Sequence, residues 1–190
     1  MLKRRKIKNK WIFMLFLTSS FFLIPFGLLS CKATSAQKTY TTKIVKVYDG
    51  DTFYSTNKTY RVFGIDTPEL SNEKTAKIVS PIENHYGSLA RSFVEKKILG
   101  QNVEVQEIKL DKYKRIVSKI FVNGQDLAKM LISEGLAKVA YISTDKKSLF
   151  YTKDSSYYHE LVKLQSSSQK AKKGFWKKTK WKWINLDKKI

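Results

Sequence analysis

The sequence predicts an α+β fold, mainly β, in which five short strands form a Greek-key barrel of the OB type with three helices. Five segments rich in β-forming residues alternate apolar and polar side chains, and Gly, Asn and Asp turn signals separate them. One segment with helical spacing interrupts them after the third strand. Five short strands with one inserted helix match this architecture, because a barrel leaves no sheet edge exposed.

The strands are predicted in order along the chain. Residues 41–48, 51–55 and 58–65 form a three-strand meander, with Asp49-Gly50 typical of a hairpin turn and Asp66-Thr67-Pro68 ending the third strand. Residues 102–110 and 115–122 are the fourth and fifth strands. The apolar phase slips by one residue between Val105 and Ile108, which predicts a β-bulge in the fourth strand.

Three helices are predicted from apolar residues spaced three and four apart. The first begins near Tyr86, after a loop over residues 70–84, and ends before Gly100. The second covers residues 125–134 and ends at Gly135, which is typical of a helix C-terminus. The third covers residues 157–173 and ends at Gly174.

The charge of the chain predicts a polyanionic partner. The 190 residues contain 37 Lys and Arg against 16 Asp and Glu, a net charge of +21. The first 30 residues contain six of the basic residues and no acidic one, so the surplus belongs mainly to the folded part. Nucleic acid and anionic lipid headgroups are the two partner classes that such a surplus favours. A general solubility surplus is the simpler explanation of charge taken alone.

The N-terminus has the pattern of a bacterial lipoprotein signal. A basic run over residues 3–10 precedes an uncharged apolar stretch over residues 11–31, which ends in Leu28-Leu29-Ser30-Cys31. A small residue before the only cysteine of the chain resembles a lipobox, so we predict a signal peptide over residues 1–30 and lipidation at Cys31. An uncleaved membrane helix and a buried cysteine are the alternatives.

On either membrane interpretation, residues 32–190 lie outside the cell, because the basic flank stays on the cytoplasmic side. We therefore expect a lipid-anchored protein at the extracellular face of the cell membrane. Residues 31–40 are small and polar and are predicted to be a tether, followed by a domain over residues 41–176. Residues 177–190 form a basic, Trp-containing tail that could contact lipid or nucleic acid or be disordered.

Two acidic residues are predicted to meet at one rim of the barrel. Asp51 begins the second strand and Asp66 ends the third, and antiparallel neighbours joined near residues 56–58 bring these ends together. Two adjacent carboxylates repel each other unless a cation lies between them, and hard oxygen ligands suit Ca²⁺ or Mg²⁺. Arg61 is an odd number of residues from Asp66, so its presence at this rim requires a break in the strand, for example at Gly64.

These segments resemble the staphylococcal nuclease family in order and approximate spacing. The segments that carry the resemblance are Asp49-Gly50-Asp51-Thr52, Arg61 to Glu69, Asp111 to Arg115, residues 135–141 and residues 171–176. The resemblance covers residues 41–176, and it implies an OB barrel that hydrolyses DNA and RNA with Ca²⁺ and leaves 3′-phosphate ends.

The resemblance also implies a role for each matching residue. Asp51 and Asp66 match carboxylates that bind calcium, and Thr67 matches a residue that offers its backbone carbonyl. Glu69 matches the general base, and Arg61 and Arg115 match arginines that hold the phosphate. The residues that match substrate contacts are Lys112, Tyr113 and Tyr141. Lys114 stands where the family has glycine, and Ser143 where one member has a second pocket tyrosine.

The alternative function is a non-catalytic OB-fold lipoprotein that binds nucleic acid. Such a protein would hold single strands through charge and stacking. A binder has no reason to keep Asp51, Asp66 and Glu69 beside two arginines, because carboxylates repel its ligand. The sequence therefore favours the enzyme, which we expect to be a monomer.

Overall fold

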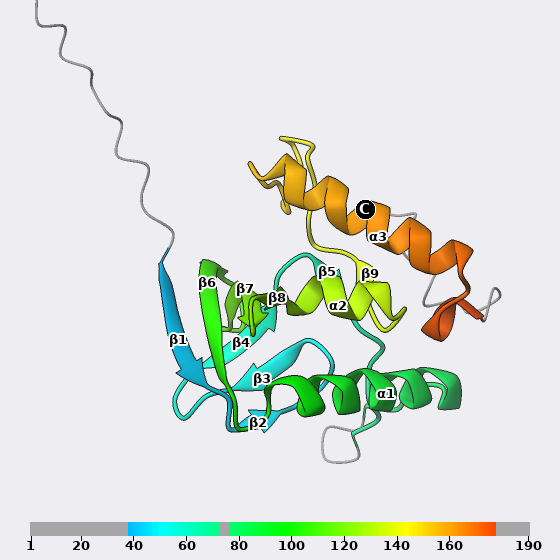
Figure 1. Ribbon diagram of the computed structural model, residues 1–190, viewed down its shortest axis with the longest axis horizontal. Coiled ribbons are helices and arrows are strands. Elements are labelled where there is room, and N and C mark those ends of the chain that lie inside the picture. The colour runs from blue at the N-terminus through cyan, green and yellow to red at the C-terminus, as the bar shows by residue number, and fades with distance from the viewer. Residues whose placement is uncertain (1–37, 73–76, 178–190) are drawn as a thin grey trace, which may run out of the picture. The chain divides into compact units, whose positions relative to one another are not determined.

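The computed structural model describes residues 38–72 and 77–177 (Figure 1). The predicted signal peptide, Cys31, most of the predicted tether and the basic tail beyond Lys177 lie outside the described residues. Within the described residues, no helix has both the length and the apolar character needed to cross a bilayer.

The described chain is mainly β with three α-helices. One sheet joins its strands in the order β1-β6-β7-β4-β3-β2, and β8 pairs with β7. Most neighbours are antiparallel, but β4 and β7 are parallel. The bounds of these strands are β1 Thr39–Lys43, β2 Lys46–Val47, β3 Thr52–Tyr54, β4 Thr59–Val62, β6 Asn102–Leu110, β7 Ile116–Val122 and β8 Gln125–Asp126.

The first predicted strand is divided into β1 and β2. These two segments stand at opposite ends of the sheet order, although only Ile44 and Val45 separate them in the chain. β1 pairs with β6 and β2 pairs with β3. β1 begins at Thr39, so Thr39 and Tyr40 belong to the sheet and not to the tether, because they pair with Gln106 and Val105. Closure of the sheet into a complete barrel stays a prediction.

The predicted β-bulge in the fourth strand is confirmed. The pairing of β6 with β7 shifts register between Glu107 and Lys109, within one residue of the predicted phase slip. Apolar residues before the shift, such as Val103 and Val105, are fully buried, whereas Leu110 beyond it is mostly exposed. The bulge turns the end of β6 outward, where the chain enters the turn before β7.

Two of the three helices begin earlier than the sequence pattern predicts, and the second begins two residues later, at Leu127. α1 spans Pro81–Ile98 and starts five residues before Tyr86, because Ser80 caps it by accepting a hydrogen bond from the Glu83 N–H and Pro81 fits the first turn. α3 spans Ser155–Lys170, with Asp154 as its N-cap. α2 spans Leu127–Ser133. The polar residues before each apolar stripe supply the caps and are therefore part of the helices' beginnings.

A small second ladder carries part of the site. β5, Ile65–Asp66, pairs antiparallel with β9, Lys138–Val139, which lies in the short apolar segment after α2. The sequence does not predict this pairing, since two-residue strands leave no alternation. After α3, a 3₁₀ turn over Gly174–Lys177 buries Phe175 and Trp176 against Tyr86 of α1. The domain therefore extends to the end of the predicted boundary.

One buried hydrogen bond joins α2 to α3, which lie beside each other in Figure 1. Asp126 caps α2 through Oδ1, which accepts from the Lys129 N–H at 3.1 Å. Its Oδ2 accepts from the Tyr157 hydroxyl at 3.0 Å. Both residues are buried, and Tyr157 packs its ring against Phe63 of the sheet layer. Tyr157 thus packs at the start of α3.

Replacing Tyr157→Phe should lower the free energy of unfolding by about 1–3 kcal/mol, because the buried Asp126 Oδ2 loses its donor. Urea denaturation measures the change. Tyr158→Phe is the control, since Tyr158 neighbours Tyr157 in α3 and its ring meets the His159 ring edge to face. Equal losses in both variants would contradict the assigned role of the Asp126–Tyr157 bond.

Candidate active site

The structure brings eight of the predicted site residues to one pocket. The pocket has a volume of about 690 Å³. The predicted residues that line it are Asp51, Arg61, Asp66, Glu69, Lys112, Tyr113, Arg115 and Tyr141. Thr67 is buried directly beside Asp51 and does not line the pocket. Cys31, the predicted lipidation site, lies outside the described residues.

Asp51 is held rigidly at the base of the pocket. Asp49 Oδ1 accepts hydrogen bonds from the N–H groups of Asp51 and Thr52, which fixes the turn that begins β3. Asp51 Oδ2 in turn accepts from the Thr67 N–H at 3.0 Å and from its hydroxyl at 2.9 Å. The turn before β3 and the segment after β5 are therefore joined through a single carboxylate, as the predicted convergence of strand ends requires.

Arg61 lies between the two predicted metal-binding carboxylates. Its Nη1 is 2.5 Å from Asp51 Oδ2, and its Nη2 donates to Asp66 Oδ1 at 3.2 Å. The predicted strand break is confirmed, because β4 ends at Val62 and Gly64, two residues later, has a φ of +81°. This left-handed residue reverses the alternation, so Arg61 and Asp66 face the same pocket.

The buried Nη1 of Arg61 makes an ion pair with Asp51 but has no aligned hydrogen-bond acceptor. The side chain is only 11% exposed, yet it lines the pocket. The ion pair with Asp51 therefore fixes, from the buried side, the orientation of a guanidinium that borders the pocket.

Burial and mutual repulsion shift the acidic groups of this cluster. Burial, followed by the charge of Asp51, raises the pKa of Asp49 to about 8. The same two causes raise the pKa of Asp66 to about 7. Burial acts to lower the pKa of Arg61, but the charges of Asp51 and Asp66 outweigh it and hold that pKa above its ordinary value. Lys138 of β9, 3.8 Å from Asp66 Oδ2, adds a second buried cation to the cluster.

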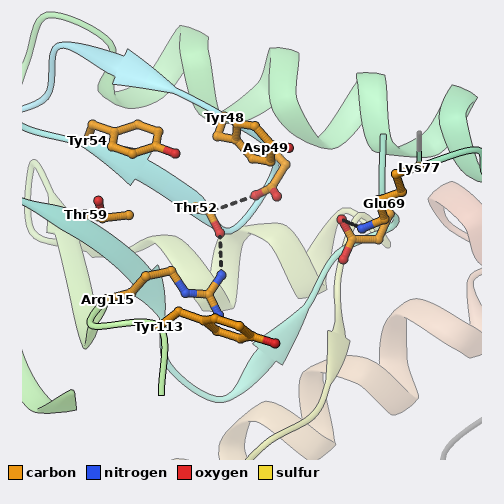
Figure 2. Close-up of a pocket in the computed structure, with 9 residues that line it drawn as sticks. All are labelled: Tyr48, Asp49, Thr52, Tyr54, Thr59, Glu69, Lys77, Tyr113 and Arg115. Atoms are coloured by element: carbon orange, nitrogen blue, oxygen red, sulfur yellow. Dashed lines mark hydrogen bonds and ion pairs between the residues drawn. The ribbon is translucent and has the colours of Figure 1, made fainter. Parts of the chain in front are cut away.

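Glu69 lies on the wall of the pocket and is 40% exposed along its side chain. Lys77 Nζ is 2.9 Å from its Oε2 (Figure 2). The backbone of Glu69 packs closely against α1 at Gly87, where a Cβ atom would lie 2.6 Å from the Glu69 carbonyl oxygen. Gly87 is thus the residue that lets α1 support the position of Glu69.

Arg115 is held by the turn that precedes β7. Asp111 Oδ1 accepts from the N–H groups of Tyr113 and Arg115, and its Oδ2 accepts from Arg115 Nε at 2.6 Å. These hydrogen bonds lower the pKa of Asp111 against the opposing effect of burial. Lys114 has a φ of +63°, which confirms that a side chain occupies the left-handed position where the resemblance predicts glycine.

Aromatic side chains border the pocket on two sides. The Tyr113 ring lies 5.3 Å from the Arg115 guanidinium carbon and 5.0 Å from Lys112 Nζ. On the other side, the Tyr141 ring lies 5.6 Å from the Arg61 guanidinium carbon and meets Phe150 edge to face. Tyr113 is 67% exposed and Tyr141 is 45% exposed, so both rings can stack on a planar ligand.

The oxygen donors of this pocket suit a hard cation. Neither His nor Cys lines it. Over the described ranges, no group of three or more His, Cys, Asp and Glu side chains is close enough to hold a metal ion. Asp51 and Asp66 would therefore supply two carboxylate ligands to a bound cation, and backbone carbonyls and water would supply the remaining ligands. Mixed carboxylate, carbonyl and water shells are typical of Ca²⁺ and Mg²⁺, so the residues present fit such an ion.

Three site residues have no assigned role in the sequence interpretation. Asp49 and Asp111 belong to two of the segments that carry the family resemblance, where the sequence indicates only turns. The structure shows that their side chains also orient Asp51, Thr52 and Arg115. Lys138 comes from a segment far along the chain, and no local pattern connects it to Asp66. A lysine within an apolar run is the one signal that could have identified it.

The chain is similar in sequence to one described family and to several known proteins. The family model described as "Staphylococcal nuclease homologue" matches residues 59–178. A probable endonuclease, LCL3, of Komagataella phaffii is 26% identical over 70% of this chain and 68% of its own length. The SPbeta prophage-derived endonuclease YokF of Bacillus subtilis is 29% identical over 70% of this chain and 43% of its own length. An uncharacterized protein of Bacillus anthracis is 26% identical over 70% of this chain and 59% of its length.

Because the family model covers more than half of the residues, the chain belongs to the staphylococcal nuclease family. This membership supports nuclease chemistry at the pocket and agrees with a mainly β fold with three helices. The chain spans about two thirds of the length of the first relative and about half of that of the other two, so the activity of the whole protein is a separate question.

In the presence of a chelator, we expect the folded chain to lose stability as pH rises from about 4 to about 8. Asp49 and Asp66 keep their protons to about pH 8 and 7 in the fold, against an ordinary value of 3.8. The folded state then binds more protons than the unfolded state, so the free energy of unfolding falls with pH through that window, by at most about 1.4 kcal/mol per pH unit for each group.

Urea denaturation at several pH values measures this slope. Asp49→Asn should flatten it, since the amide oxygen still accepts both backbone hydrogen bonds but the group no longer titrates. Asp145→Asn, in an exposed turn, is the matched control. A slope that is the same in both variants and in the unmodified chain would contradict the assignment to Asp49.

Proposed function

We propose that this member of the staphylococcal nuclease family is a calcium-dependent nuclease that hydrolyses phosphodiester bonds of DNA and RNA. The observation that carries the proposal is that Arg61 and Arg115 share one pocket with Asp51, Asp66 and Glu69. Two guanidinium groups, a carboxylate base and a pair of hard oxygen ligands are the groups that phosphodiester hydrolysis needs. The net charge of +21 favours a polyanionic substrate over a small ester.

Asp51, Asp66 and the backbone of Thr67 are the proposed calcium ligands. When bound, the ion neutralises phosphate charge and lowers the pKa of a coordinated water. Asp51 and Asp66 both contact the guanidinium of Arg61, which supports this assignment, because the two carboxylates then lie close enough to share a cation. Even with Arg61 and Lys138 beside it, Asp66 has a pKa raised to about 7 by burial and by the charge of Asp51, so additional positive charge at this point is favourable.

The chain's own groups have distinct proposed roles. Glu69 accepts a proton from the attacking water. The water oxygen forms a bond to phosphorus, and the bond from phosphorus to the 5′ oxygen breaks. Arg61 and Arg115 donate hydrogen bonds to the phosphate oxygens as charge builds on them. Lys112 and Tyr113 face the terminal phosphate side of the substrate, and Tyr141 stacks beside the nucleoside. The alternative, a non-catalytic nucleic-acid-binding lipoprotein, leaves the acidic cluster without a purpose.

The activity test uses the full chain in detergent micelles with single-stranded DNA and RNA. We expect fragments with Ca²⁺ and none with a chelator. Glu69→Gln should lower kcat by about 10²–10⁴-fold. Arg115→Lys should lower it by about 10²-fold or more, because a single ammonium cannot reproduce the two-pronged contact.

Matched controls are Glu95→Gln and Arg91→Lys, which alter an exposed ion pair on α1 away from the pocket. Circular dichroism confirms that each variant folds. Near-full activity in Glu69→Gln and Arg115→Lys, or cleavage that persists unchanged in chelator, would end the nuclease proposal.

We also propose that Cys31 carries a lipid anchor that holds the domain at the outer face of the cell membrane. The lipobox-like Leu28-Leu29-Ser30-Cys31 sequence after an uncharged stretch supports it. In a bacterial host fed radiolabelled palmitate, the full chain should incorporate label and Cys31→Ser should not. Ser30→Ala, which keeps a small residue before the cysteine, is the control and should be labelled normally. Equal labelling of Cys31→Ser would rule out the anchor at this residue.

A further inference from the structure

Lys138 places a positive charge beside Asp66 without lining the pocket itself. The residue is 4% exposed, and its Nζ lies 3.8 Å from Asp66 Oδ2. The other carboxylate oxygen of Asp66, Oδ1, accepts a hydrogen bond from Arg61 Nη2 at 3.2 Å. Each oxygen of this carboxylate therefore faces a different cation, one from a residue that lines the pocket and one from a residue that does not.

The pairing of two short strands fixes the contact between Lys138 and Asp66. Asp66 of β5 and Lys138 of β9 are directly opposite each other in an antiparallel pair (Figure 1). Directly opposite residues project from the same face, with Cβ atoms about 4.5–5.5 Å apart. α3 holds β9 in place, since Gln165 Oε1 accepts a hydrogen bond from the Val139 N–H at 2.6 Å. Because the Lys138 side chain is also buried, its ammonium group stays close to Asp66.

A buried lysine at this position requires a reason. Removing an ammonium group from water is costly, and a close carboxylate recovers that cost only in part. Position 138 lies within the apolar segment over residues 136–142, where an apolar side chain would avoid the cost altogether. Lys129 and Lys173, by contrast, make exposed ion pairs. Solvent and salt screen a buried charge much less than an exposed one, so the charge of Lys138 acts strongly on its immediate surroundings.

A cation held by Asp51 and Asp66 would be subject to this charge. The two carboxylates are the proposed calcium ligands, and Lys138 adds positive charge on the Asp66 side. A fixed positive charge lowers the affinity of a nearby cation site in two ways. It repels the ion directly, and it offsets the negative charge that attracts the ion. Because Lys138 does not line the pocket, these effects reach the ion through Asp66 and not through contact with the substrate.

We propose that Lys138 sets the calcium affinity of this site by weakening it, as a buried charge that acts through Asp66. The proposal rests on the proposed calcium-dependent function and adds a means of tuning it. Lys138 supplies a counter-charge to Asp66 when no ion is bound, and it limits how tightly the ion is held once bound. A neutral side chain at position 138 then gives a tighter calcium site.

The test measures calcium binding directly, by isothermal titration calorimetry of the full chain in detergent micelles without nucleic acid. Lys138→Met removes the charge and keeps an unbranched side chain of similar length. We expect the dissociation constant for Ca²⁺ to fall by about 5- to 50-fold, because a buried repulsive charge has been removed. Lys138→Arg keeps the charge and should not tighten calcium binding.

Lys119→Met is the matched control for net charge. The Lys119 side chain is also largely buried, at 13% exposed, and its Nζ pairs with Asp154 at 2.7 Å. Neither of these two residues lines the pocket. The control variant loses the same unit of charge as Lys138→Met, so its dissociation constant for Ca²⁺ should stay within about twofold of that of the unmodified chain.

Thermal unfolding gives a second measurement that does not require a fully stable variant. A ligand that binds the folded state raises Tm by an amount that grows with its affinity. The rise in Tm between chelator and a fixed concentration of Ca²⁺ should therefore be larger for Lys138→Met than for the unmodified chain or Lys119→Met. This comparison holds even where Lys138→Met lowers the Tm measured in chelator.

Each other outcome has a definite meaning. An unchanged or weaker calcium affinity in Lys138→Met would overturn the proposal, because the lysine would then only support the fold around Asp66. Equal tightening in Lys119→Met would also overturn it, since net charge would be the cause. An absence of calcium binding in every variant would contradict the calcium assignment and the role of Lys138 together. Tighter binding in Lys138→Met, with no cleavage of DNA by the unmodified chain, would support the role of Lys138 and contradict the nuclease proposal alone.

Discussion

The site depends on one buried guanidinium. Arg61 lies between Asp51 and Asp66, and with Asp49 this forms a cluster in which three carboxylates face a single arginine and the more distant Lys138. Removing charges from water is costly, and the cost is recovered only when partners and hydrogen bonds surround them. Asp51 meets that condition with both the N–H and the hydroxyl of Thr67. Asp66 meets it less well, since its pKa is raised to about 7. The cluster is therefore poised to accept further positive charge.

The two arginines of the pocket are held differently, and this difference has a structural cause. Arg61 extends from β4 inside the sheet and is tied to buried acids, so its position follows from the core. Arg115 follows an exposed turn and is oriented by Asp111, a neighbour four residues away. Its side chain is 28% exposed, against 11% for Arg61. Arg61 is thus fixed by the core, while Arg115 is held by its own turn and lines the pocket from the more exposed side.

Local patterns predict the strands, the bulge and the main site residues, because each rests on spacing within a few residues. The convergence of Asp51 and Asp66 follows from a meander, and the break at Gly64 follows from the need to bring Arg61 to the same face. The start of α1 was predicted too late, since Ser80 and Pro81 cap the helix without any apolar periodicity. Lys138 escapes prediction because it reaches the site through the pairing of β9 with β5, which lie far apart in the sequence. The signal peptide, Cys31 and the tail remain predictions.

The basic surface and the buried centre of the pocket act differently on a polyanion. A net charge of +21 attracts polyanions to the surface as a whole. At the base of the pocket the charge is close to balanced, because Arg61 and Lys138 face Asp51 and Asp66. Burial moreover raises the pKa of Asp49 to about 8 and that of Asp66 to about 7, which lowers the negative charge there near neutral pH. Long-range attraction therefore comes from the exposed lysines and arginines, whereas the buried groups largely offset one another. Binding to the surface and chemistry at the centre thus depend on different sets of residues.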